Sequence, residues 1–150
     1  MSEPLTVETV LVPVDGSDES VTAIEYAVAI AEQYGASIHV VYVLGEEIVR
    51  GIETDTLDRE AVASEAESFV ETATGIADEA GVTVTSSTAY GFSTTQKIRH
   101  PGSAVLDCAD EVDADFLVIP REPSTDGPGD VLERAAEYVL LYASQPVLST

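Results

Sequence analysis

Three short and almost uninterrupted apolar runs constrain the fold of this chain more than any other feature. They lie at Val7–Val14, Ala36–Leu44 and Phe116–Ile119. Such runs are typical of strands that are covered on both faces, because a strand with one wet face alternates apolar and polar residues. Segments with helical spacing of apolar residues separate the runs. Strands and helices that alternate in this way predict an α/β fold, a doubly wound parallel sheet with right-handed crossovers and helices on both faces.

Two weaker segments complete the predicted sheet. Val82–Tyr90 alternates in character along its length, so we expect a half-exposed strand at a sheet edge, and Pro146–Ser149 is a short last strand. The chain thus predicts five strands in one domain over residues 1–150. With the first and fourth strands central, the economical strand order is 3-2-1-4-5. The point where the order reverses, a common ligand position, then lies between Asp15 and the loop Pro120–Asp130.

Helix boundaries follow from capping residues and apolar stripes. The first helix begins after Ser17, a good N-cap, and ends at Gly35. A polar and acidic segment, Gly45–Thr56, reads as a surface connection that adds nothing to the core. Three more helices are predicted, at Leu57–Ala80, Pro101–Val112 and Asp130–Ala143.

The charge of the chain restricts its environment and its partners. There are 28 acidic against 6 basic residues, a formal net charge of -22, and the acids are spread over all the predicted helices. The carboxylates of such an acidic coat repel one another unless salt screens their charges. This indicates a salt-loving host such as a halophilic archaeon. An acidic patch for a basic partner is the alternative. Nucleic acid binding is excluded as a function class, because it needs a basic stripe.

Several other site classes lack support in the sequence. No apolar run approaches the roughly 20 residues of a membrane span, and the start has no signal-peptide layout, so a cytoplasmic protein is expected. Cys108 falls in an apolar helical pattern and reads as a buried small hydrophobe. His39 reads as a satisfied strand residue and His100 as a solvent-exposed loop residue. Neither histidine has metal-ligating neighbours in the sequence, so we predict no metal site and no catalytic residue.

Four segments in order resemble the universal stress protein family, and the likeness covers essentially the whole chain. Its fold would have the five-stranded arrangement predicted above. The resemblance also implies a homodimer in which the last strands of two subunits pair, here through Val147 and Leu148. The segments that carry the likeness are Val10–Ser17, Gly81–Val82, Ala114–Ile119 and the end of the chain, with Ala136–Leu140 and Gln145–Leu148.

The chain departs from this family where its ATP-binding members hold phosphate. Those members carry Gly-x-x-Gly, nine residues, then Gly-Ser or Gly-Thr at the start of the last helix. The matching positions here are Pro120, Pro123, Glu133 and Arg134. Two N–H donors are lost to proline, and Glu133 brings a carboxylate close to a phosphate position. Asp130 and Glu133 also have the spacing of a capping box, which would satisfy the helix start from within.

Part of the family site remains. The resemblance places Asp15 by the adenosine moiety and Val43 at the end of the second strand, whereas Asp15 could equally bond local backbone N–H groups and shape its turn. A reduced cradle of hydroxyl and N–H groups would come from Ser124, Thr125, Gly127 and Gly129.

We therefore expect a non-enzymatic, ATP-independent stress protein without a cofactor, which acts as a homodimer through contacts with an unidentified protein. The alternative is a small-molecule or nucleotide-binding protein with a rebuilt loop, in which Arg121 or Arg134 faces an anion. ATP bound with Mg²⁺ belongs to that alternative, because Glu122, Asp126 and Asp130 would repel the phosphates. An enzyme for ATP hydrolysis or phosphotransfer ranks third, since no residue is placed as a base.

Overall fold

The computed structural model describes residues 6–90, 100–120 and 130–150, which contain one five-stranded sheet. All strand pairs are parallel, and the order β3-β2-β1-β4-β5 confirms the prediction. The strands are β1 (Thr9–Val14), β2 (Ser37–Leu44), β3 (Val84–Tyr90), β4 (Phe116–Ile119) and β5 (Val147–Ser149). The helices are α1 (Asp18–Tyr34), α2 (Glu46–Glu53), α3 (Arg59–Glu79), α4 (Pro101–Glu111) and α5 (Asp130–Tyr142).

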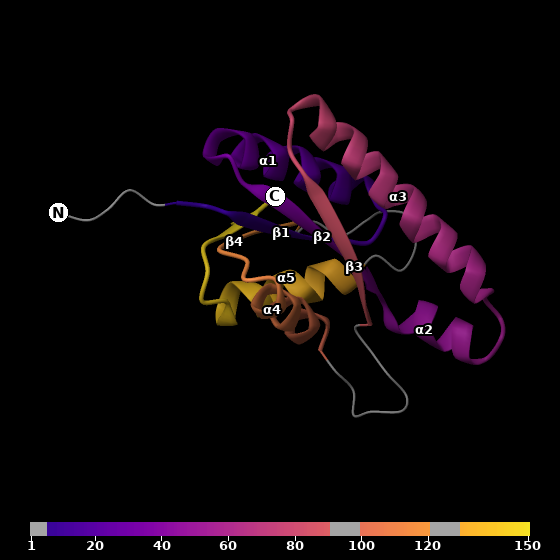
Figure 1. The fold of residues 1–150 in the computed structure, drawn as a ribbon. Coiled ribbons are helices and arrows are strands. Elements are labelled where there is room, and N and C mark those ends of the chain that lie inside the picture. The colour runs from indigo at the N-terminus through magenta and orange to yellow at the C-terminus, as the bar shows by residue number, and fades with distance from the viewer. Residues whose placement is uncertain (1–5, 91–99, 121–129) are drawn as a thin grey trace.

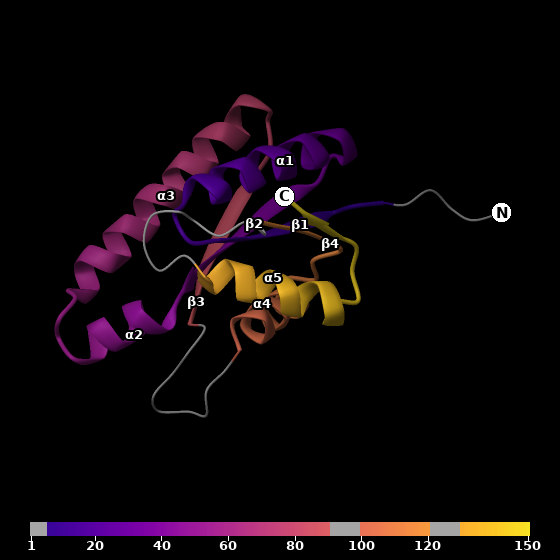
Figure 2. The same ribbon diagram turned by 180° about the vertical axis from the view of Figure 1, so that it is seen from behind.

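Helices cover both faces of the sheet (Figure 1). The pair α1 and α3 lies on one face and the pair α4 and α5 on the other, as the reverse view also shows (Figure 2). Side chains of β1 alternate between the two cores: Val10 and Val12 join the α1–α3 side, and Leu11 joins the α4–α5 side. Burial on both faces explains why the central strands read as continuous apolar runs.

The central strand is tied to β4 at its start. Val10 is in register with Ile38 of β2 and with Phe116 of β4. Just before β4, the carboxylate of Asp115 accepts the backbone N–H of Glu8 at 2.9 Å and that of Thr9 at 3.1 Å. This carboxylate therefore satisfies backbone donors where the ladder between the two strands begins.

The predicted caps of the first helix are confirmed. Ser17 is the N-cap of α1, and its hydroxyl accepts the N–H of Ser20 at 3.3 Å. Gly35 ends the helix with a φ of 68°, the left-handed conformation that glycine adopts without strain. The other predicted elements, including the edge strand β3, agree with the structure to within about two residues.

One prediction was wrong: the segment expected to be a polar connection contains α2. Val49 of this helix is buried, and the side chain of Leu57 folds back over Gly51. Ile48, Val49 and Ile52 recur at helical spacing, and the acids on either side of them obscured the pattern. The helix therefore contributes to the core. No helix within the described ranges is long and apolar enough to cross a bilayer.

Candidate functional site

The carboxyl ends of the parallel strands meet at one edge of the sheet, and the connections diverge there. The chain leaves β1 toward β2 and leaves β4 toward β5, so the reversal lies between β1 and β4. Open α/β sheets bind ligands at this position. Asp15 directly follows β1, Val43 stands near the end of β2, and Pro120 directly follows β4. The structure thus brings these sequence-predicted residues to one edge.

The carboxylate of Asp15 is bound by its own turn. Its Oδ1 accepts the backbone N–H of Ser17 at 3.0 Å and the hydroxyl of Ser20 at 2.9 Å. The Ser20 hydroxyl also lies 3.0 Å from the Asp15 backbone N–H. Asp15 is only half-buried, whereas Ser20 is fully buried. Asp15 and Ser20 therefore form a closed local network that shapes the β1–α1 turn and the start of α1.

Tyr42 of β2 holds the same turn from the other side. Its hydroxyl donates to the backbone carbonyl of Asp15 at 3.2 Å, and its ring makes an edge contact with Phe69 of α3. Burial raises the pKa of Tyr42, and the charges of Asp15 and Glu65 raise it further, so the phenol stays protonated as a donor. A Cβ on Gly16 would lie 2.8 Å from this hydroxyl, which explains the glycine there.

The end of β2 is packed against the start of α5. Val43 is 2% exposed and shares a core cluster with Val131 and Leu132 of α5. A Cβ built on Gly45, just after β2, would stand 3.4 Å from the Cβ of Val131. The side chain of Val43 therefore does not line an open site, and a ligand could reach only its backbone.

The positions that the resemblance matches to the family's phosphate motif differ in exposure. Pro120 is buried, Glu133 is half-buried and Arg134 is exposed, the last two near the start of α5. The side chain of Asp130 lies outside the described residues, so the capping box stays a prediction.

Much of the predicted phosphate loop also lies outside the described residues. This applies to Arg121, Glu122, Pro123, Ser124, Thr125, Asp126, Gly127 and Gly129. Their contribution to a site therefore stays a prediction. Among the described residues, no cluster of three or more His, Cys, Asp and Glu side chains could hold a metal ion.

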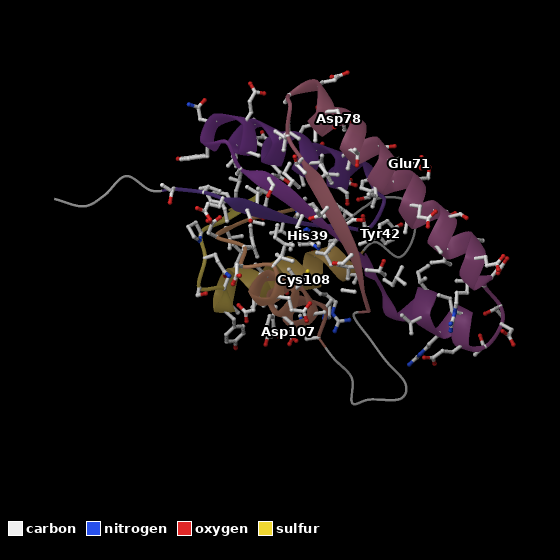
Figure 3. The ribbon with its side chains drawn as sticks, in the orientation of Figure 1. His39, Tyr42, Glu71, Asp78, Asp107 and Cys108 are labelled. Atoms are coloured by element: carbon white, nitrogen blue, oxygen red, sulfur yellow. The ribbon has the colours of Figure 1, made fainter. Side chains whose placement is uncertain are left out.

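A second polar cluster joins β2, β3 and α4. His39 is buried, and its Nδ1 and Nε2 lie 2.7 Å from the Thr85 hydroxyl and 2.9 Å from the Ser87 hydroxyl. Ser87 in turn lies 3.6 Å from the sulfur of Cys108, which Figure 3 shows on α4 beside the sheet. Burial lowers the pKa of His39 and raises that of the Cys108 thiol. Both residues thus have the structural roles that the sequence predicts.

His100 is not the exposed loop residue that the sequence predicts. It is half-buried and forms the N-cap of α4. Its ring stacks on Tyr138 of α5 at a centroid distance of 4.6 Å. Sequence could not reveal this contact, because the two residues belong to different helices.

A comparison with known proteins decides the family. The model of the universal stress protein family matches residues 6–149. The chain belongs to this family. Universal stress protein MJ0531 of Methanocaldococcus jannaschii is 25% identical over 142 residues, which cover 93% of this chain and 79% of that protein.

Solved universal stress protein structures share the fold. One in complex with cAMP superposes with a TM-score of 0.66 at 23% identity and covers 97% of this chain and 98% of its own. A protein from Archaeoglobus fulgidus in complex with dAMP gives a TM-score of 0.65 at 24% identity, with the same coverage. At this identity the likeness establishes the fold alone.

The sequence analysis did not predict two residues of the candidate site at the β1–α1 turn. Ser20 interrupts the apolar stripe of α1, and Tyr42 interrupts the aliphatic run of β2. A buried polar group in an apolar pattern needs a hydrogen-bond partner. That rule would have indicated both residues, although it does not name Asp15 as the shared partner.

Proposed function

We propose that this chain is a non-enzymatic universal stress protein that works without ATP, as a homodimer, through contacts with another protein. The observation that carries the proposal is the network at Asp15. One oxygen of Asp15, the carboxylate that the resemblance places by the adenosine moiety, accepts Ser17 N–H and the Ser20 hydroxyl. These bonds account for Asp15 without any ligand.

The start of α5 supports the same proposal. A helix N-terminus binds phosphate through free N–H groups and its positive dipole end. Here Glu133 puts a half-buried carboxylate in that region, and Val131 is already packed against Gly45. An anion as highly charged as ATP would meet repulsion from this carboxylate in addition to the net charge of -22.

Calorimetric titration with ATP and Mg²⁺ in concentrated potassium chloride tests this part. We expect no measurable binding to the wild-type chain. The matched variant restores the family pattern with Pro120→Gly, Pro123→Gly, Glu133→Gly and Arg134→Ser, and we expect it to gain affinity. A micromolar Kd for the wild-type chain would refute ATP independence.

A nucleotide-binding alternative is favoured by the two solved relatives that hold cAMP and dAMP. A monophosphate brings less charge to the start of α5 than ATP does. The same calorimetry with dAMP separates the readings: saturable binding that Asp15→Ala abolishes would support the alternative. Absence of binding at millimolar dAMP would leave the protein-contact proposal.

The homodimer rests on two features near the end of the chain. Three apolar side chains at the end of α5 are exposed, with Leu140 at 49%, Leu141 at 76% and Tyr142 at 65%. Four residues separate them from β5, an edge strand of half-buried residues. Exposed apolar residues and an unpaired edge strand are each typical of an interaction surface.

The backbone of β5 indicates which groups would pair. Pro146 accepts the N–H of Leu117, and Thr150 donates to the carbonyl of Ile119, so both face β4. Backbone groups alternate in direction along a strand, so those of Val147 and Ser149 point to the free edge. A second copy could pair there while the partly buried Leu148 keeps its contact with the core on the α1–α3 side.

Analytical ultracentrifugation of two Ser149 variants tests the dimer. Ser149→Pro removes an outward N–H without touching the bonds to β4, whereas Ser149→Ala keeps it. We expect the wild type and Ser149→Ala to sediment as dimers and Ser149→Pro as a folded monomer. A monomeric wild type, or a Ser149→Pro variant that remains dimeric, would contradict pairing through β5.

We further infer that the protein works in a salt-rich cell. Its formal net charge of -22 is carried by a surface on which acids recur along every described helix. Screening by salt makes such a charge compatible with a compact fold.

A further inference from the structure

The helix α4 begins with a histidine that acts as a hydrogen-bond acceptor. His100 has the extended conformation of an N-cap, and its Nδ1 accepts the N–H of Gly102 at 3.0 Å. Pro101 between them has no N–H, so Gly102 is the first backbone donor of the helix that needs a partner. A ring nitrogen accepts a hydrogen bond only without a proton, so only neutral His100 caps α4.

The same ring belongs to the contact between α4 and α5. His100 lies against Tyr138 with an interplanar angle of 26°, and Tyr138 contacts Tyr142 at a centroid distance of 4.6 Å. Gly102 is buried directly beneath Tyr138, where any Cβ would overlap the tyrosine side chain. The cap, the glycine and the aromatic stack therefore form one joint between the first turn of α4 and α5.

Charges around the ring oppose its protonation on balance. Burial lowers the pKa of His100, Arg134 of α5 lowers it further, and Glu137 of α5 raises it. The first turn of α4 carries no acid that would offset a positive charge at the positive end of the helix dipole. A protonated His100 would still be attracted to the Tyr138 ring, and this attraction would help to keep the imidazolium in place. It does not give Gly102 a new acceptor.

We propose that His100 is a pH-sensitive latch on α4: a proton taken up from solvent at Nδ1 removes the cap on Gly102 and loosens the first turn where it packs on α5. The latch is closed while the ring is neutral. It opens as the pH falls through the range in which the ring titrates. It would let the α4–α5 face respond to acidification, whichever ligand or partner the protein binds.

Nuclear magnetic resonance of the full labelled chain, at one fixed and high potassium chloride concentration, tests the latch. The ring resonances of His100 report its protonation, and hydrogen exchange of the Gly102 amide reports the cap. From about pH 7.5 to pH 5, we expect the Gly102 protection factor to fall about fivefold, the change that a lost N-cap of typical strength implies. The midpoint should match that of His100 and lie below about pH 6.5.

Three variants separate the latch from general acid destabilisation. His100→Asn keeps an N-cap acceptor that does not titrate, so protection should be independent of pH. His100→Ala should show the low protection already at neutral pH. His39→Gln should leave the Gly102 transition unchanged. Constant Gly102 protection through the His100 titration, or the same fall in His100→Asn, would overturn the proposal.

Discussion

At the scale of single residues, Asp15 shows how one side chain can match a family site and serve the fold. Sequence left two interpretations open, a ligand contact and a turn-forming carboxylate. The structure shows turn-forming bonds, since Oδ1 accepts two donors of the same turn, and the ligand contact stays a prediction. Sequence did not predict these bonds, because one of the partners, Ser20, lies on the next helix in an otherwise apolar stripe.

Replacement of Asp15 should therefore reduce stability. We expect Asp15→Ala to lower the free energy of unfolding by about 1–3 kcal/mol, because Ser17 N–H and the Ser20 hydroxyl lose their acceptor. Ser20→Ala should have an effect of similar sign, and the double variant should be less destabilised than the sum of the two. Urea unfolding in high salt measures all three. Unchanged stability of Asp15→Ala would show that the network contributes nothing.

His39 and Cys108 could be predicted where His100 could not. A histidine inside a strand and a cysteine inside an apolar helical stripe each reveal their environment through near neighbours in sequence. His100 precedes a proline at a helix start, which looks like a loop. Its environment comes from Tyr138 on another helix, and only tertiary packing brings the two together.

At the scale of elements, continuous apolar runs and caps located the strands and four of the helices. They failed for α2, because its three apolar residues stand in a short segment flanked by acids, although one of them, Val49, is buried. A short helix gives few turns over which periodicity can accumulate. In the structure the side chain of Leu57 packs on Gly51 of this helix, a contact that periodicity does not predict.

Two glycines inside helices make a matched test of helix packing. Gly75 of α3 has open space around it, so Gly75→Ala should stabilise the protein by about 0.5–1 kcal/mol through helix propensity. Gly102, in the first turn of α4, lies under Tyr138, so Gly102→Ala should destabilise by about 1–3 kcal/mol. Thermal unfolding of both variants compares them. Equal shifts in Tm would show that α4 and α5 are not in close contact.

His39, which joins β2 to the edge strand β3, predicts that the stability of the protein depends on pH. Burial holds the pKa of His39 below its ordinary value of about 6.5, so the unfolded chain takes up the proton first as the pH falls. The stabilising contribution is thus complete above about pH 6.5 and is lost as the pH falls through the folded-state pKa. Urea unfolding at several pH values should show this loss. His39→Gln should reduce the slope, and His39→Gln with His100→Asn should remove it above the range in which carboxylates titrate.

At the scale of the whole molecule, the sequence predicts the order of the strands, but it does not predict the structure of the loop after β4. Right-handed crossovers and one half-exposed strand leave few arrangements of five parallel strands, and β3-β2-β1-β4-β5 is the one observed. We expect the chemistry of the site to depend on Pro120 and the following loop, where the sequence has prolines and acids in place of the glycines that the resemblance implies. Physical rules for helices and sheets do not specify which ligand or partner such a loop would bind.

The acidic coat predicts that salt stabilises the folded protein. Exposed acids such as Glu71 and Asp78 project from α3 away from the sheet (Figure 3). From about 0.15 M to 1 M potassium chloride the Debye length falls from about 8 Å to 3 Å, so self-repulsion weakens and Tm should rise.

The variant Glu67→Gln, Glu71→Gln, Asp78→Asn changes the formal charge from -22 to -19. Because repulsion within a uniform coat scales with the square of the charge, its Tm should depend on salt about a quarter less steeply. Sucrose, which is uncharged and stabilises by exclusion from the surface, should raise both Tm values equally. A Tm that is flat in potassium chloride, or equal slopes for the two proteins, would mean that the coat does not set the stability of this fold.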